Sequence, residues 1–124
     1  MKILIQNGRV IDPASGLDRA CDVALAAGRI IGIGQVPAGF APNRTIDATG
    51  CIVAPGLVDL AVRLREPGHE HEGMLESEMA AAVAGGVTSL VCPPDTDPVL
   101  DEPGLVEMLK FRAEKLHQSR LFPL

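Results

Sequence analysis

The sequence has no tryptophan, no tyrosine and only three phenylalanines among its 124 residues. A core built from this chain must therefore consist mainly of Ala, Val, Leu and Ile side chains. No apolar run approaches the roughly 18 residues that a membrane-spanning helix needs. The apolar stretch at the N-terminus is too short for a signal peptide. With 47% hydrophobic and 22% charged residues, the composition is that of a globular protein rather than a disordered one.

Clustered basic residues and paired cysteines are also missing. The 11 Lys and Arg residues are scattered and the net charge is −5, which argues against nucleic acid and against an anionic membrane surface. The cysteines Cys21, Cys51 and Cys92 lie far apart and form no Cys-x-x-Cys motif. We expect them to be reduced, small buried hydrophobic residues in a cytoplasmic protein.

The first 54 residues read as short strands separated by turn residues. Asn7–Gly8 and Ala27–Gly28 are hairpin signals, and residues 12–16 and 35–43 have the composition of loops. This spacing predicts the N-terminal strands of a small antiparallel β-sandwich. The expected strands are residues 2–6, 9–11, 21–25, 30–33, 45–47 and 51–53.

From Pro55–Gly56 onward the pattern changes to strands that alternate with helices. We expect strands at 57–64, 87–92 and 120–124, a helix at 74–84 that stops at Gly85–Gly86, and a second helix capped by Asp101 with Pro103 in its first turn. The predicted apolar face of the first helix consists of Leu75, Met79, Ala82 and Val83. On the second helix Leu105, Leu109, Arg112 and Leu116 share a face, with Arg112 as its polar member.

A β-α-β-α-β order implies parallel strands joined by right-handed crossovers. Two and a half strands cannot close a (β/α)₈ barrel, which typically needs about 250 residues. We therefore interpret the chain as α/β, with residues 1–54 as sandwich strands and 55–124 as the incomplete first part of a barrel in a longer protein. A small open α/β domain is the alternative.

Five segments carry the informative motifs of the chain: Asp47–Gly50, Val53–Asp59, Leu64–Glu70, Ala84–Thr88 and Val91–Pro98. In order and in register, these motifs resemble the dihydroorotase branch of the amidohydrolase superfamily. Arg65-Glu66-Pro67-Gly68 favours dihydroorotase over the hydantoinases and allantoinases that share the scaffold. The resemblance implies a (β/α)₈ barrel, a small sandwich built from both chain ends, and zinc-assisted ring closure of carbamoyl aspartate in pyrimidine synthesis.

The resemblance breaks at the zinc ligands. In the family pattern Asp-x-His-x-His-x-Arg, this chain has Ala61 and Arg63 at the two histidine positions. Alanine has no donor atom, and arginine stays protonated and has no lone pair to offer. A guanidinium about 4 Å from a Zn²⁺ ion would cost about 8 kcal/mol at an effective dielectric of about 20. We therefore predict no metal site at Ala61 and Arg63 and no catalytic residue in this chain.

Two further positions concern the substrate. Arg65 matches the family's carboxylate-binding arginine, which can grip a carboxylate with two hydrogen bonds. Asp95 stands where the family has a substrate-holding asparagine, and its carboxylate would repel the two carboxylates of carbamoyl aspartate. Arg65 and Asp95 are therefore weak substrate-binding candidates, the first retained and the second altered.

Other residues have competing interpretations. His69 and His71 could replace the lost pair, although their place in a loop beyond the strand favours a role without metal. Asp59 is either a remnant of the metal site or a partner for Arg63, and the second is preferred because a buried arginine needs a carboxylate. His117 is expected to be a solvated residue on the second helix.

The resemblance implies a catalytically silent dihydroorotase-like chain that needs no zinc and acts as a structural partner of aspartate transcarbamoylase, as some bacterial family members do. The sequence also leaves open whether the protein forms homo-oligomers. The alternative is an active zinc-dependent cyclic amidohydrolase whose remaining ligands lie beyond residue 124. A free-standing binding domain is a third interpretation.

Overall fold

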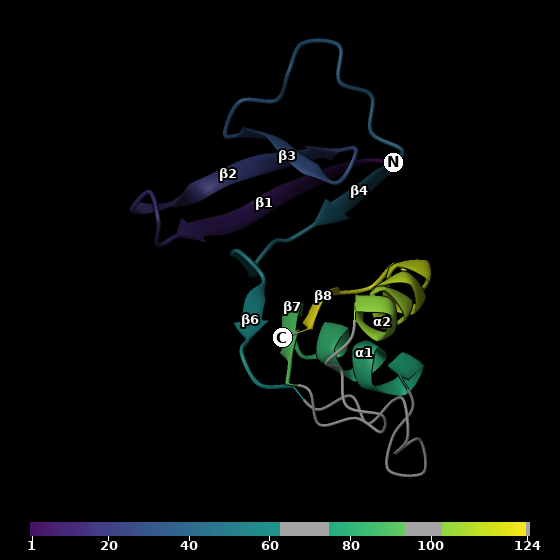
Figure 1. The fold of residues 1–124 in the computed structure, drawn as a ribbon. Coiled ribbons are helices and arrows are strands. Elements are labelled where there is room, and N and C mark those ends of the chain that lie inside the picture. Colours follow the sequence, from purple (N-terminus) through teal and green to yellow (C-terminus); the bar gives the residue numbers. More distant parts are fainter. Residues whose placement is uncertain (63–74, 94–102, 124) are drawn as a thin grey trace. The chain divides into compact units, whose positions relative to one another are not determined.

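The computed structural model describes residues 1–62, 75–93 and 103–123. The chain divides into two compact units, Met1–Pro55 and Gly56–Leu124, whose elements are labelled in Figure 1. The predicted boundary between residues 54 and 55 lies one residue from this division. Within the described ranges, no helix is long and apolar enough to cross a membrane.

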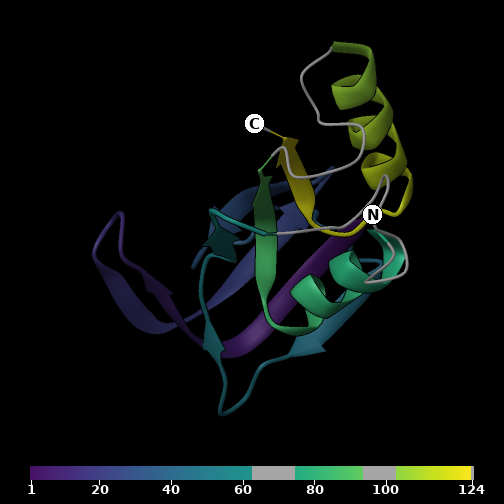
Figure 2. The same cartoon turned by 60° about the horizontal axis from the view of Figure 1, so that its bottom comes forward.

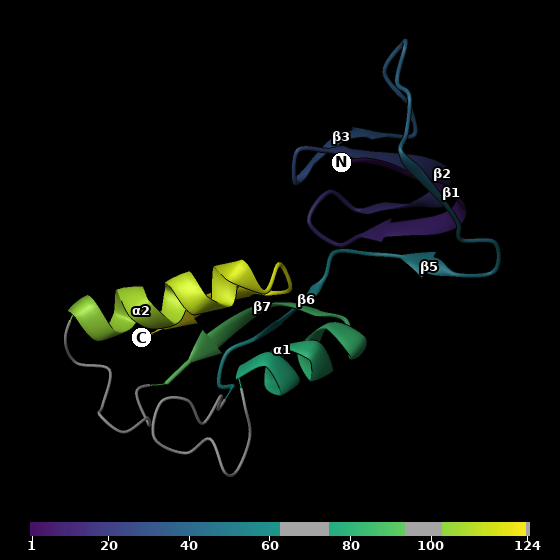
Figure 3. The same cartoon turned by 90° about the vertical axis from the view of Figure 1, so that its right-hand side faces the viewer.

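The first unit is a five-stranded sheet. The strand order is β3-β2-β1-β4, and β5 also pairs with β1 (Figures 1 and 3). β1 with β2 and β2 with β3 are antiparallel, but β4 and β5 run parallel to β1. The expectation of a purely antiparallel arrangement is therefore wrong for these last two strands. The strands are β1 (Lys2–Asp12), β2 (Leu17–Ala26), β3 (Arg29–Ile33), β4 (Arg44–Asp47) and β5 (Ile52–Val53).

The parallel pairing follows from the long connection between β3 and β4. Residues 34–43 carry the chain back to the start of β1, where the Asn43 N–H donates to the Lys2 carbonyl at 2.8 Å. The Lys2 N–H in turn donates to the Asn43 side-chain oxygen at 2.8 Å. The next strand therefore enters beside the beginning of β1 and runs in its direction.

The hairpin predicted at Asn7–Gly8 is wrong. β1 continues through both residues, and its register with β2 shifts between Ile5 and Gly8. Asn7 takes the left-handed conformation (φ 65°), with its N–H donating to Asp22 Oδ1 at 3.2 Å. Gly8 is buried, and a Cβ there would lie 2.5 Å from Cγ2 of Val53. The Asn-Gly pair thus forms a β-bulge and a close packing contact rather than a turn.

The hairpin predicted at Ala27–Gly28 is confirmed. These two residues join β2 to β3, and both have positive φ values, 50° and 71°. Positive φ at both central residues is the mark of a type I′ turn, whose twist matches that of the flanking strands. The expected loop at residues 12–16 is also confirmed as the turn between β1 and β2.

Within residues 56–62, 75–93 and 103–123, the second unit has three strands and two helices. The strand order is β6-β7-β8, and both pairings are parallel (Figure 2), which confirms the β-α-β-α-β prediction. Gly86 has φ 83° and ends the first helix as expected. The elements are β6 (Leu57–Asp59), α1 (Leu75–Ala84), β7 (Val87–Cys92), α2 (Pro103–Lys115) and β8 (Arg120–Pro123).

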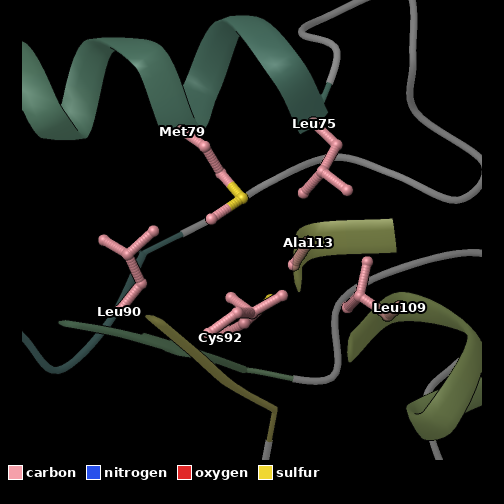
Figure 4. Packing of buried hydrophobic residues seen from close by; sticks show 7 residues of the cluster. Leu75, Met79, Leu90, Cys92, Leu109 and Ala113 are labelled. Carbon is pink, nitrogen blue, oxygen red and sulfur yellow. The ribbon is translucent and has the colours of Figure 1, made fainter. Parts of the chain in front are cut away.

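One buried cluster joins both helices to the sheet, so α1 and α2 cover the same face. Figure 4 shows these side chains pointing toward one another. Since right-handed crossovers place successive helices on one side, this packing is that of a barrel segment. The cluster comprises Leu75 and Met79 of α1, Leu90 and Cys92 of β7, Leu109 and Ala113 of α2, and Leu121 of β8.

One predicted position on the apolar face of α1 is wrong: Val83 is 48% exposed, whereas Ala82 packs against the cluster as expected. Arg112, the polar member of the predicted face of α2, is exposed, and Ala113, four residues after Leu109, takes a buried position that the prediction missed. Residues four apart lie on one helix face, and the small Ala113 side chain lets α2 approach the sheet.

The cysteines are only partly as predicted. All three are free; Cys92 is buried and Cys21 is half-buried, but Cys51 is exposed. Cys51 lies in a turn just before β5, where its N–H donates to the Ala48 carbonyl at 2.9 Å. A turn position of this kind offers no enclosing side chains, so a small apolar side chain there stays in water.

Candidate functional site

The candidate site lies at the carboxyl ends of the three parallel strands. Parallel pairing places Asp59 of β6 beside Leu90 of β7, and Cys92 beside Pro123 of β8. In barrels of this kind the chemistry occurs at the edge where the strands end. The residues just after Asp59 are therefore the ones that a barrel enzyme would use.

Asp59 makes a local turn at this edge. Its Oδ1 atom accepts a hydrogen bond from the Ala61 N–H at 3.0 Å. An aspartate that binds the N–H two residues later forms an Asx turn. The strand predicted at 57–64 accordingly ends at Asp59, and Leu60 and Ala61 form a bend.

The bend inserts one extra residue on the β6 side. In a regular continuation of the Asp59–Leu90 pairing, the Ala61 N–H would donate to the Val91 carbonyl. Instead, the Val62 N–H makes that bond at 2.9 Å. Val62 packs against the buried cluster beneath the helices, whereas Ala61 is exposed. The backbone thus turns Val62 toward the helices, and Ala61 away from them.

The described residues do not fit a zinc ion at this position. Structural and catalytic zinc sites take three or four N, O or S ligands from the protein. Ala61 offers no donor atom, and the carboxylate of Asp59 is a single ligand group. Within the described part of the chain, no three His, Cys, Asp or Glu residues come together as a candidate metal group.

The remaining predicted site residues lie outside the described residues: Arg63, Arg65, His69, His71 and Asp95. The pairing of Asp59 with Arg63 therefore stays a prediction. What the structure adds is the Asx turn, which the sequence interpretation missed because it treated Asp59 as a charge partner. The signal was available, since a turn needs only an aspartate and a free N–H two residues later.

A hollow of about 590 Å³ lies elsewhere in the second unit. Its lining includes Lys110, His117 and Phe122, together with Ser119 and Arg120 at the start of β8. This is the amino-terminal end of the strand, opposite to the edge where barrel chemistry occurs. His117 is exposed, as predicted, but it lies in the turn after α2 rather than on the helix, and its N–H donates to the Glu114 carbonyl at 3.2 Å.

Comparison with known proteins agrees with this architecture. A family described as dihydro-orotase-like matches residues 50–124. The chain belongs to this family. A "Dihydroorotase-like protein" of Pseudomonas aeruginosa is 51% identical over all 124 residues, and a "Dihydroorotase" of Pelobacter propionicus is 44% identical. The chain spans 29% of the length of each of these relatives.

Solved structures place this dihydro-orotase-like chain among the amidohydrolase barrels. The L-hydantoinase of Arthrobacter aurescens superposes with a TM-score of 0.75 at 26% identity, over 90% of this chain and 24% of that enzyme. Molinate hydrolase shares the fold, with a TM-score of 0.70 at 24% identity over 98% of this chain and 29% of the other. The predicted fold class is confirmed, and the chain holds the start of the barrel.

Proposed function

We propose that the dihydro-orotase-like protein containing this chain is catalytically silent in pyrimidine synthesis and acts as a structural partner of aspartate transcarbamoylase. The observation that carries the proposal is the position of Ala61. This residue lies at the carboxyl end of the first barrel strand with its side chain turned away from the helices, where the family has its first zinc-binding histidine. A methyl group there can bind neither metal nor substrate oxygen.

The sequence around this residue supports the same conclusion. Arg63, two residues further, would bring a fixed positive charge to the second ligand position. Asp95 replaces an asparagine that would bind substrate, while Arg65 is kept. The buried cluster of the described residues does not include Ala61, so its packing does not require a histidine at that position.

The partner part of the proposal rests on the family resemblance, and the relatives support the dihydroorotase-like assignment only. Two Pseudomonas proteins, 51% and 53% identical to this chain, carry the description "Dihydroorotase-like protein", whereas relatives at 40–46% are described as "Dihydroorotase". A protein that keeps the scaffold without the ligands has a use for its surface rather than for its site. Complex formation with aspartate transcarbamoylase is that use.

The deciding experiment is the zinc content of the full-length protein, purified with zinc supplied and measured by elemental mass spectrometry. We expect a stoichiometry near zero. The matched variant Ala61→His with Arg63→His restores both ligand positions and should raise zinc binding. One zinc per chain in the unaltered protein would overturn the silent assignment, favour an active cyclic amidohydrolase with ligands beyond residue 124, and call for a screen of cyclic amides.

Size-exclusion chromatography with aspartate transcarbamoylase tests the partnership separately. Co-elution at micromolar concentrations is expected, and separate elution of the two proteins would refute it. The Ala61→His and Arg63→His variant should co-elute as well, because its changes lie in the site.

A further inference from the structure

The turn at Asp59 sets the direction of the residues that follow β6. Ala61 cannot form its regular sheet bond because the Val91 carbonyl accepts the Val62 N–H at 2.9 Å instead. The displaced Ala61 N–H would be left without a partner if the Asp59 carboxylate did not accept it at 3.0 Å. The carboxylate gives this N–H a partner within the chain, and the Asx turn that results favours the extra residue in the strand.

The bulge has a consequence for the two faces of the sheet. Val62 belongs with the side chains packed beneath α1 and α2, near Leu90 and Cys92. Alternation along the strand then sends Ala61 to the opposite side. Without the extra residue, position 61 would take the pairing position opposite Cys92 and face the helices, and Val62 would turn away from the core.

We infer that Asp59 is a positioning residue: by accepting the Ala61 N–H, it holds a one-residue bulge that turns position 61 away from the helices, toward the interior face of the barrel. The role is independent of the side chain at position 61. It therefore gives the Asp59 carboxylate a role even though residue 61 is an alanine, which cannot bind a metal.

Thiol labelling of the 124-residue chain, at a concentration at which sedimentation shows a monomer, tests this assignment. In a background with Cys21→Ser and Cys51→Ser, single cysteines are introduced by Ala61→Cys or Val62→Cys; Cys92 is buried and remains. With Asp59 in place, the cysteine at 61 should react faster than the one at 62. Replacing Asp59 by Ala removes one hydrogen bond and should speed labelling at 62 about fivefold. Asp59→Asn, whose amide oxygen can still accept, should stay within about twofold of the parent.

Circular dichroism shows whether each variant keeps its fold. If Asp59→Ala folds and labels at position 62 no faster than the parent, the inference is wrong. If Asp59→Ala does not fold, hydrogen exchange on the unaltered chain decides. The Ala61 amide should then exchange more slowly than that of Leu60, and exchange at the rate of an unstructured amide would refute the bond. Neither readout depends on zinc, so the result stands apart from the silent-partner proposal.

Discussion

Three aspartates of the described residues each bind the N–H two positions later. Asp12 accepts from Ala14 at 3.2 Å, Asp47 from Thr49 at 3.1 Å and Asp59 from Ala61 at 3.0 Å. Each lies at the end of a strand, where the backbone leaves the sheet and its N–H groups lose their regular partners. At the scale of the residue, these carboxylates organise turns.

Asp47 has several polar contacts besides the bond to the Thr49 N–H. The Thr49 hydroxyl donates to its Oδ1 atom at 2.6 Å, and the Asn7 amide donates to the same oxygen at 3.2 Å. These hydrogen bonds, the Thr49 hydroxyl first, lower the pKa of Asp47. On the other edge of β1, the Arg9 guanidinium lowers the pKa of Asp18 through a two-bond contact at 2.7 Å.

A depressed pKa predicts a specific dependence of stability on pH. The ionised Asp47 is favoured in the folded chain, so its contribution is fully present above the unfolded value of about 3.9 and is lost as the pH falls through the folded pKa. Asp47→Asn should therefore be less stable than the parent at pH 7, and the difference should shrink toward pH 2. Urea unfolding across this range measures it. An equal difference at both ends would contradict the assignment.

Two dipeptides that predict a hairpin turn show that the structure of an element can differ from the one its local sequence favours. Asn7–Gly8 has the stronger hairpin signal, yet it lies inside β1 as a bulge. Ala27–Gly28 has the weaker signal, yet it forms the two-residue turn between β2 and β3. β1 continues because strands pair with it on both sides, β2 on one and β4 and β5 on the other. This pairing outweighs the preference of two residues.

The turn at Ala27 can be improved. Ala27 has φ 50°, a conformation that costs an L-residue other than Gly, Asn or Asp about 1–2 kcal/mol. Ala27→Asn should raise the free energy of unfolding by about 0.5–1 kcal/mol, and Ala27→Val should lower it. Urea unfolding provides the measurement. The matched control is Ala20→Asn at an exposed position of β2, which should not raise the free energy of unfolding. An equal increase in this control would show that the turn is not the cause.

The whole chain leaves large apolar side chains in water. Ile30 and Leu57 are each 61% exposed, Leu60 is 72% exposed and Phe122 is 50% exposed. The first unit also has a largely apolar hollow of about 250 Å³ that includes Val10, Val23 and Ile33. Exposed apolar surface on this scale marks a surface that another segment or protein covers. The chain spans 29% of the length of its relatives, which agrees with this interpretation.

This exposure predicts the behaviour of the 124-residue chain on its own. It should bind the dye ANS and self-associate at micromolar concentrations, because apolar patches gain free energy when they leave water. Leu60→Ser with Phe122→Ser should reduce both effects, whereas Ser77→Ala on α1 should not. Dye fluorescence and analytical ultracentrifugation provide the measurements. If the chain is a monomer that binds no dye, the exposed apolar side chains do not form a surface that drives self-association.

Local physical chemistry determined much of this protein from the sequence. The alternation of apolar strands and helices after Pro55, the Gly86 helix stop and the family motifs predict the start of a parallel barrel, and the structure confirms it. The missing donor at Ala61 is likewise a property of the side chain itself. Such features depend on residue type and short spacing, so no distant contact was needed to predict them.

Other features were decided by tertiary structure. The parallel entry of β4, the bulge at Asn7 and the burial of Ala113 in place of Arg112 depend on strands and helices brought together from far along the chain. The role of Asp59 belongs here as well. Its carboxylate takes the Ala61 N–H because the next residue occupies the Val91 carbonyl across the sheet, and only strand pairing establishes that competition.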